Sequence, residues 1–147
     1  MKQVHLTVGV ITIAAWVATT LYGAWGWWRV SSSPWFWRLL RAAQVLIVVQ
    51  VALGGVLVAL GHKPPHLHLI YGILPLLLSL IAEALRAASA QNVLDTRGYA
   101  SAQAVGKQPV DEQRSVVLAI LRRELAVMTI AALVIVVLLL RAAQTAG

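Results

Sequence analysis

The chain has 147 residues, enough for one domain, and it is too apolar for an ordinary soluble protein. Hydrophobic residues make up 60% of it, its mean hydropathy is +0.80, and only 12% of its residues are charged. It contains no cysteine, which excludes disulfides, thiolate ligation of haem and iron–sulfur ligation by this chain. Its net formal charge of +7 comes from basic residues that flank apolar segments. We therefore attribute the charge to membrane topology and to contact with anionic lipids, and expect no nucleic-acid partner.

Four apolar segments are long enough to cross the hydrocarbon layer, which a helix of about 20 residues can span. We predict transmembrane helices at about 4–28, 36–61, 65–88 and 117–141. The first segment is too long for the apolar part of a cleaved signal peptide, and no small-residue cleavage site follows it. The sequence thus predicts an all-α membrane protein, a single four-helix domain over residues 1–147, packed as an antiparallel up-down bundle. The polar stretch 89–115 is expected to be a loop.

The basic residues predict how this bundle is oriented. With four spans, the first and third connections lie on one side of the membrane. That side carries nine of the twelve basic residues: Arg29, Arg38, Arg41, Arg86, Arg97, Lys107, Arg114, Arg122 and Arg123. The other side carries Lys2, Lys63 and Arg141. The positive-inside rule places both termini outside, N-out and C-out, in a multi-pass protein of a bacterial-type plasma (inner) membrane.

Two further expectations concern the later spans. Glu83 and Arg86 are three residues apart near the inner end of the third span, so we expect them to pair on one helix face. The fourth span consists mainly of Leu, Val, Ile and Ala, and we expect it to act as scaffold.

The turn between the second and third spans carries the residues that point to a function. Around it the sequence reads from Gln50 to Gly72 as QVALGGVLVALGHKPPHLHLIYG, and we expect this turn on the outer face. His68 is followed four residues later by Gly72, and the N-terminus repeats the spacing with His5 and Gly9. Positions i and i+4 share a helix face, so each imidazole is expected above a bare patch of backbone. A flat macrocycle fits such a patch.

His5 and His68 lie near the outer ends of two helices that run in the same direction, so we expect them at the same depth. A six-coordinate haem b needs one imidazole on each face of the ring. His66 points about 200° away from His68, so only one of the two can face the pocket. We predict His5 and His68 as the ligands of the haem iron, with His66 as a substitute ligand.

Two neighbouring features suit the same cofactor. Gly54 is expected to let a flat ligand approach the second span closely, and Lys63, with Lys2, is expected near the haem propionates. Two other interpretations of the histidines remain open. They are polar residues at helix ends in wet surroundings, or His62, His66 and His68 together bind a metal ion.

Residues 4–88 resemble one half of haem A synthase, a family of twin four-helix membrane bundles that bind b-type haem through histidine pairs. The resemblance rests on His5 at the outer start of a helix, on Gln50-x-x-Leu53-Gly54-Gly55, and on His68 after a proline-bearing outer turn. It implies that His5 and His68 are axial ligands. Lys2 stands where the family has a catalytic glutamate, and the family's outer-loop cysteine pair and second half are absent. Haem A synthase activity of this chain alone is therefore disfavoured, and we assign no catalytic residue.

Our leading hypothesis is a cytochrome b-like membrane haem protein with bis-histidine ligation, active in electron transport or as a subunit of a respiratory complex. Its expected partners are membrane lipids and either other membrane redox-complex subunits or further copies of itself. The alternative is a cofactor-free accessory or structural subunit of a respiratory or photosynthetic membrane complex.

Overall fold

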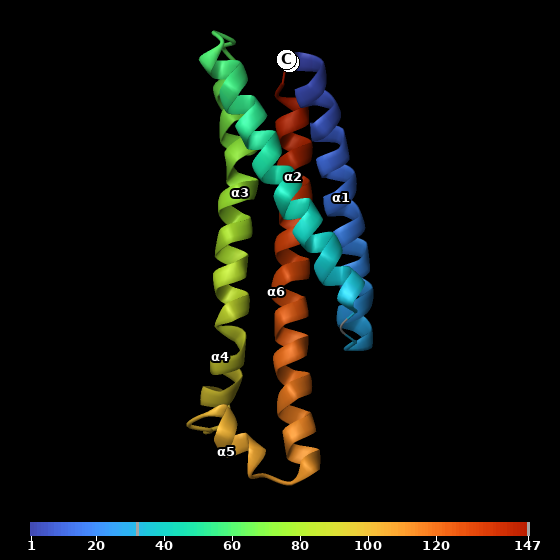
Figure 1. The fold of residues 1–147 in the computed structure, drawn as a ribbon, viewed down its shortest axis with the longest axis vertical. Coiled ribbons are helices and arrows are strands. Elements are labelled where there is room, and N and C mark those ends of the chain that lie inside the picture. Colours follow the sequence, from blue (N-terminus) through green and yellow to red (C-terminus); the bar gives the residue numbers. More distant parts are fainter. Residues whose placement is uncertain (32, 147) are drawn as a thin grey trace.

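The computed structural model describes residues 1–31 and 33–146, and these residues form six helices and no strand (Figure 1). The four long helices are α1 (Lys2–Arg29), α2 (Pro34–Ala59), α3 (His66–Ala87) and α6 (Val110–Gln144). Each is long and apolar enough to cross a membrane. They run alternately up and down, so that α1 begins at the end of the bundle where the chain terminates. The predicted all-α membrane bundle is confirmed.

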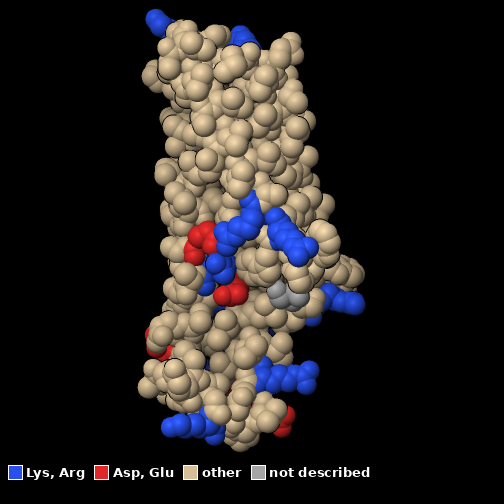
Figure 2. Space-filling model, in the orientation of Figure 1, with Lys and Arg blue, Asp and Glu red and all other residues tan. Residues whose placement is uncertain are grey.

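We name the two ends of this bundle after their characteristic residues, the histidine end and the basic end. The histidine end contains the start of α1, the turn between α2 and α3, and the end of α6. The basic end is the opposite one, where α1 meets α2. Figure 2 shows the contrast between them on one face: an upper part without Lys, Arg, Asp or Glu except at its rim, and a lower part with a band of these charged side chains.

The fourth span, expected as scaffold, is the central helix of the bundle. α6 packs mainly against α3 and α1, while α2 packs against α1 and runs obliquely toward the upper end of α3, passing in front of α6 in Figure 1. In the most apolar 18 residues of α6, 44% are buried, compared with 11% in α2. Its inward-facing residues recur at alternating steps of three and four, the spacing of a coiled-coil seam. They are Leu125, Met128, Ala132, Ile135, Leu139 and Ala142.

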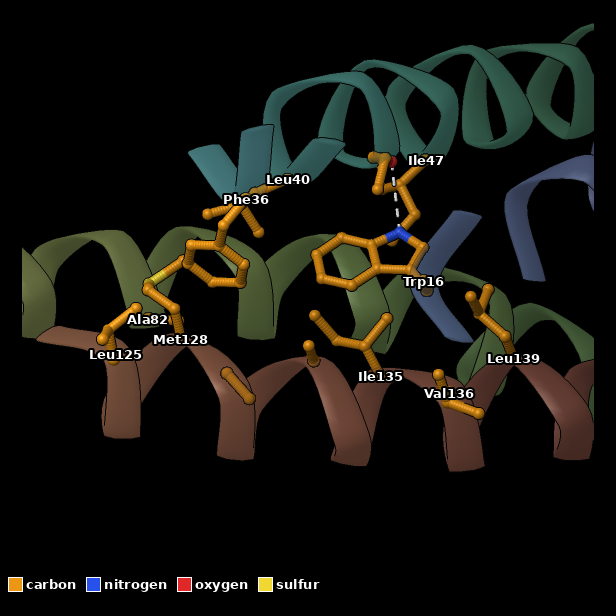
Figure 3. Packing of buried hydrophobic residues seen from close by; sticks show 13 residues of the cluster. Trp16, Phe36, Leu40, Ile47, Ala82, Leu125, Met128, Ile135, Val136 and Leu139 are labelled. Carbon is orange, nitrogen blue, oxygen red and sulfur yellow. Dashed lines mark hydrogen bonds between the residues drawn. The ribbon is translucent and has the colours of Figure 1, made fainter. Parts of the chain in front are cut away.

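Trp16 of α1 occupies the middle of the core (Figure 3). Its side chain is 1% exposed and packs over Ile135 of α6. The indole Nε1–H donates a hydrogen bond of 3.1 Å to the carbonyl oxygen of Ala43 in α2. A buried indole needs such a partner, because an unpaired N–H in an apolar interior is costly. One side chain thus joins the three helices α1, α2 and α6.

The connection at the basic end is short and capped on both sides. Val30 ends α1 in the left-handed region with φ of 49°, and the N–H of Ser31 returns to the carbonyl of Gly26 at 3.0 Å. The side chain of Ser33 then accepts a hydrogen bond from the N–H of Trp35, and Pro34 occupies the first position of α2. Serine at the cap followed by proline is a favoured helix start.

Residues 89–115 are not the loop that we expected. They contain α4 (Ser89–Thr96), α5 (Ala102–Gly106) and the first turns of α6. A few apolar residues in this polar stretch are enough to form a second small core, which consists of Val93, Leu94, Val105 and Val116. An ion pair of 3.2 Å between Arg97 and Glu112 links the segment after α4 to the start of α6. The 35 residues of α6 rise about 52 Å, which exceeds the hydrocarbon thickness of about 30 Å. The first turns of α6 therefore lie outside the span, and together with α4 and α5 they form a small helical cap, residues 89–115, beyond the basic end.

Gly23 lets α1 pack closely against α2 and α6, and it yields a test of the packing. A Cβ atom there would lie 2.5 Å from Oγ1 of Thr129 and 2.8 Å from Cε2 of Phe36. Replacing glycine by alanine inside a helix normally stabilises it by about 1 kcal/mol. For Gly23→Ala we expect instead a loss of about 1–3 kcal/mol, because the core is overpacked.

Gly55→Ala is the matched control, since no atom lies within 4 Å of the Cβ position of this helical glycine. It is expected to be neutral or stabilising. SDS-induced unfolding of both variants in detergent micelles measures the difference. If Gly23→Ala is as stable as Gly55→Ala, the close packing of α1 on α2 and α6 is wrong.

Candidate functional site

Two of the four histidines meet at the histidine end. The rings of His5 in α1 and His68 in α3 have centroids 6.1 Å apart, with an angle of 67° between their planes. Both side chains are partly buried, whereas His62 and His66 are exposed. The two histidines that share the four-residue spacing to a glycine are therefore the two that the fold brings together.

The orientation of His68 is fixed by α6. Its Nδ1 lies 2.9 Å from the carbonyl oxygen of Ala142. A carbonyl oxygen only accepts, so Nδ1 carries the proton and donates it, and the Nε2 of the neutral ring keeps a lone pair. Ala142 lies in the last turn of α6, and its carbonyl oxygen also accepts longer hydrogen bonds from the N–H and Oγ1 of Thr145, at 3.3 and 3.2 Å. Histidines that bind metals are commonly oriented by such a bond from the second ring nitrogen.

His5 has a less complete set of partners. Its Nε2 lies 3.3 Å from Nε2 of Gln50 in α2. Within the described part of the chain, the buried atoms Nδ1 of His5 and Oε1 of Gln50 have no hydrogen-bond partner. Each such buried polar atom costs about 1–3 kcal/mol, and most native proteins contain few of them. Two of them lie close together at the histidine end, and a third, Oγ1 of Thr129, lies in the core of the bundle.

Of the two glycines expected to leave a bare backbone patch beside a histidine, Gly72 does so and Gly9 does not. A Cβ on Gly54 would lie 3.3 Å from Cε1 of His5, so His5 rests against α2. The patch at Gly9 is covered, because a Cβ there would lie 2.9 Å from Nε2 of Gln50. The reason is that Gln50, a polar side chain at membrane depth, turns inward to a polar partner. Gly72 matches the expectation of a bare patch, with no atom within 4 Å of its Cβ position.

The remaining predicted residues lie at the rim. Lys63 and His66 are both exposed at the turn that leads into α3. Among residues 1–31 and 33–146, no group of three or more histidine or acidic side chains is arranged to hold a metal ion. The structure therefore gives no support to a metal site formed by His62, His66 and His68.

A second polar cluster lies between α2, α3 and α6, away from the histidine end. The expected pair of Glu83 and Arg86 is present at 3.0 Å. Glu83 also binds Arg41 at 2.8 Å and accepts from Gln44 at 2.9 Å, while Arg86 reaches Glu124 at 3.9 Å. The sequence did not indicate the roles of Arg41 and Glu124, because both contacts cross between helices. With its carboxylate shared by several donors, this cluster acts as a clamp between helices.

No family model, no curated protein and no solved structure matches the chain. We therefore infer a function from the geometry of the histidine end.

Proposed function

We propose that the chain is a membrane b-type haem protein in which His5 and His68 bind the iron from opposite faces of the ring. The observation that carries the proposal is the separation of 6.1 Å between the two ring centroids. An imidazole nitrogen lies about 2.0 Å from a metal that it binds and roughly 1.1 Å from its own ring centroid, so two imidazoles on one iron have centroids about 6 Å apart. The observed spacing fits one metal ion between the rings.

The states of the ring nitrogens support the same proposal. The bond from His68 to Ala142 leaves the lone pair of Nε2 available for a metal. The contact between His5 and Gln50, at 3.3 Å, is longer than an ordinary hydrogen bond and is readily exchanged for a bond to a metal. The buried, unpaired Nδ1 of His5 is a second sign of an incomplete environment on this side.

The surroundings of the two rings suit a flat ligand. Gly54 gives His5 its place against α2, and the open backbone at Gly72 offers room beside His68. Lys63 and Lys2 lie exposed at the same end, where they can attract haem propionates. A haem held by two histidines supplies one-electron transfer and leaves no open coordination position. The role that follows is electron transfer, by this chain alone or within a redox assembly, with other subunits or further copies of itself as partners.

We further propose that the protein lies in a bacterial-type plasma membrane with its histidine end outside. The support is the distribution of charge, since nine of the twelve Lys and Arg residues belong to the basic end and the cap beyond it.

The ligand assignment is tested by single alanine substitutions and an optical spectrum of the purified protein. Wild type is expected to show a low-spin haem spectrum. His5→Ala and His68→Ala should each abolish it, because a haem iron with only one axial histidine does not have the six-coordinate ligation that gives the low-spin spectrum. His62→Ala and His66→Ala are matched controls at exposed positions and should keep it.

Two results would contradict the assignment. Loss of the spectrum in His66→Ala with retention in His68→Ala would move the ligand to His66. A wild-type protein without haem after haem-replete expression would favour the cofactor-free accessory subunit.

Gly72→Leu tests the room for the ring without touching a ligand. The surroundings of Gly72 are open, so a leucine there meets no protein atom at its Cβ and the bundle should assemble normally. The added side chain occupies the patch beside His68, and we expect most of the haem to be lost at unchanged protein yield. Haem-to-protein ratio measured by pyridine haemochrome gives the result. Full haem content in this variant would show that the ring does not lie against Gly72.

Cysteine labelling tests the orientation, and the absence of native cysteine makes single substitutions unambiguous. Lys63→Cys lies at the histidine end and Gln103→Cys in α5, and both positions are exposed. A membrane-impermeant thiol reagent added to intact cells should label Lys63→Cys and leave Gln103→Cys unlabelled. The opposite pattern would reverse the orientation.

A further inference from the structure

A hollow at the basic end, far from the two histidines, lies where α1 ends beside α6. It has a volume of about 240 Å³ and is lined by Ala24, Trp27, Trp28 and Arg122. Nothing in the haem proposal uses these residues.

The packing of α1 on α6 explains how the hollow forms. A Cβ on Gly26 would lie 3.9 Å from Cδ2 of Leu125, so the two helices meet closely at this level. Arg122 lies three residues before Leu125, and therefore one turn further toward the cap. Trp27 is half-buried against the main core, while Trp28 is 74% exposed. The hollow thus combines indole walls with one guanidinium group.

The charge of Arg122 is not neutralised by an acidic neighbour. Within residues 1–31 and 33–146, no ion pair involves Arg122. The nearby carboxylate of Glu124 faces Arg86, and that of Glu83 faces Arg41 and Arg86. A positive side chain therefore stands at the lower limit of the apolar zone, beside two tryptophans.

We propose that this hollow binds the phosphate of an anionic phospholipid. The guanidinium of Arg122 donates to the phosphate oxygens, and the indoles of Trp27 and Trp28 contact the glycerol and the first methylene groups. Arginine suits a phosphate because its planar fork donates two parallel hydrogen bonds. Tryptophan prefers the depth of the lipid head groups, where one side of the ring is wet and the other apolar. Attraction of basic residues to anionic lipid adds to both effects.

A small phosphate in solution is a weaker match to the same residues. Three of the four lining residues are apolar or aromatic, and they offer a phosphate group nothing beyond the single guanidinium. A phospholipid adds apolar contact with the two indoles. The ligand that fits the hollow best is therefore a membrane phospholipid.

Native mass spectrometry of the full-length protein in detergent, titrated with phosphatidylglycerol or phosphatidylcholine, measures binding of the first lipid. Wild type is expected to bind phosphatidylglycerol more tightly. Arg122→Gln should weaken this binding about fivefold, the usual contribution of one basic side chain at an anionic surface. Arg123→Gln is the matched control, since Arg123 is the adjacent exposed arginine and does not line the hollow. It should bind as wild type does.

Three results would overturn the proposal. Equal weakening in Arg122→Gln and Arg123→Gln would indicate a diffuse basic surface. Equal affinity of wild type for the two lipids would exclude a site for the anionic head group. Displacement of phosphatidylglycerol by glycerol phosphate at equal concentration would show that the hollow binds a small anion and not a membrane lipid.

Discussion

The seam of α6 is the contact on which the arrangement of the other helices depends. Its buried residues alternate in steps of three and four from Leu125 to Ala142, and they receive α1 and α3 on neighbouring sides. In lipid the apolar character of a helix gives no preference for one face, so association depends on close packing and on a few interhelical hydrogen bonds. Gly23 supplies such packing by admitting Thr129 and Phe36, and the indole of Trp16 supplies such a bond to Ala43. These contacts determine which groups meet at either end of the bundle.

The two polar clusters differ in how fully their polar atoms are hydrogen-bonded. At Glu83 three donors from two helices surround one carboxylate. They join α2 to α3, and the carboxylate needs no further hydrogen-bond partner. At the histidine end, His68 is fully oriented by Ala142, whereas His5 and Gln50 each keep a buried atom without a partner. Unpaired polar atoms inside a membrane protein are expensive and commonly mark function. This contrast is why we propose a haem site at the histidines and assign the glutamate cluster to assembly.

The sequence predicted what depends on composition and on spacing along one helix. The four spans follow from hydropathy, and the proximity of His5 and His68 follows from two parallel helices that carry these histidines at equal depth. It did not predict the central position of α6, because in a membrane both lipid-facing and buried residues are apolar and the seam is hidden in the composition. The coverage of Gly9 by Gln50 was also missed, since it depends on the rotation of α2 about its axis. The cap formed by residues 89–115 was missed because its core consists of four scattered residues.

The bond between His68 and Ala142 makes the histidine site depend on the register of α6. The acceptor is a backbone carbonyl, so exchanging one side chain of the helix for another leaves the acceptor in place. A change in helix length does not, because each residue advances the backbone by about 1.5 Å and rotates it by about 100°. The seam holds that register, since sliding α6 by one residue would carry Ile135 and Leu139 away from Trp16 and its neighbours. Core packing near the middle of the bundle thus controls the proton and the lone pair of an imidazole at its end. The apolar contacts of α6 in this way help to orient His68, although the two iron ligands that we propose lie on α1 and α3.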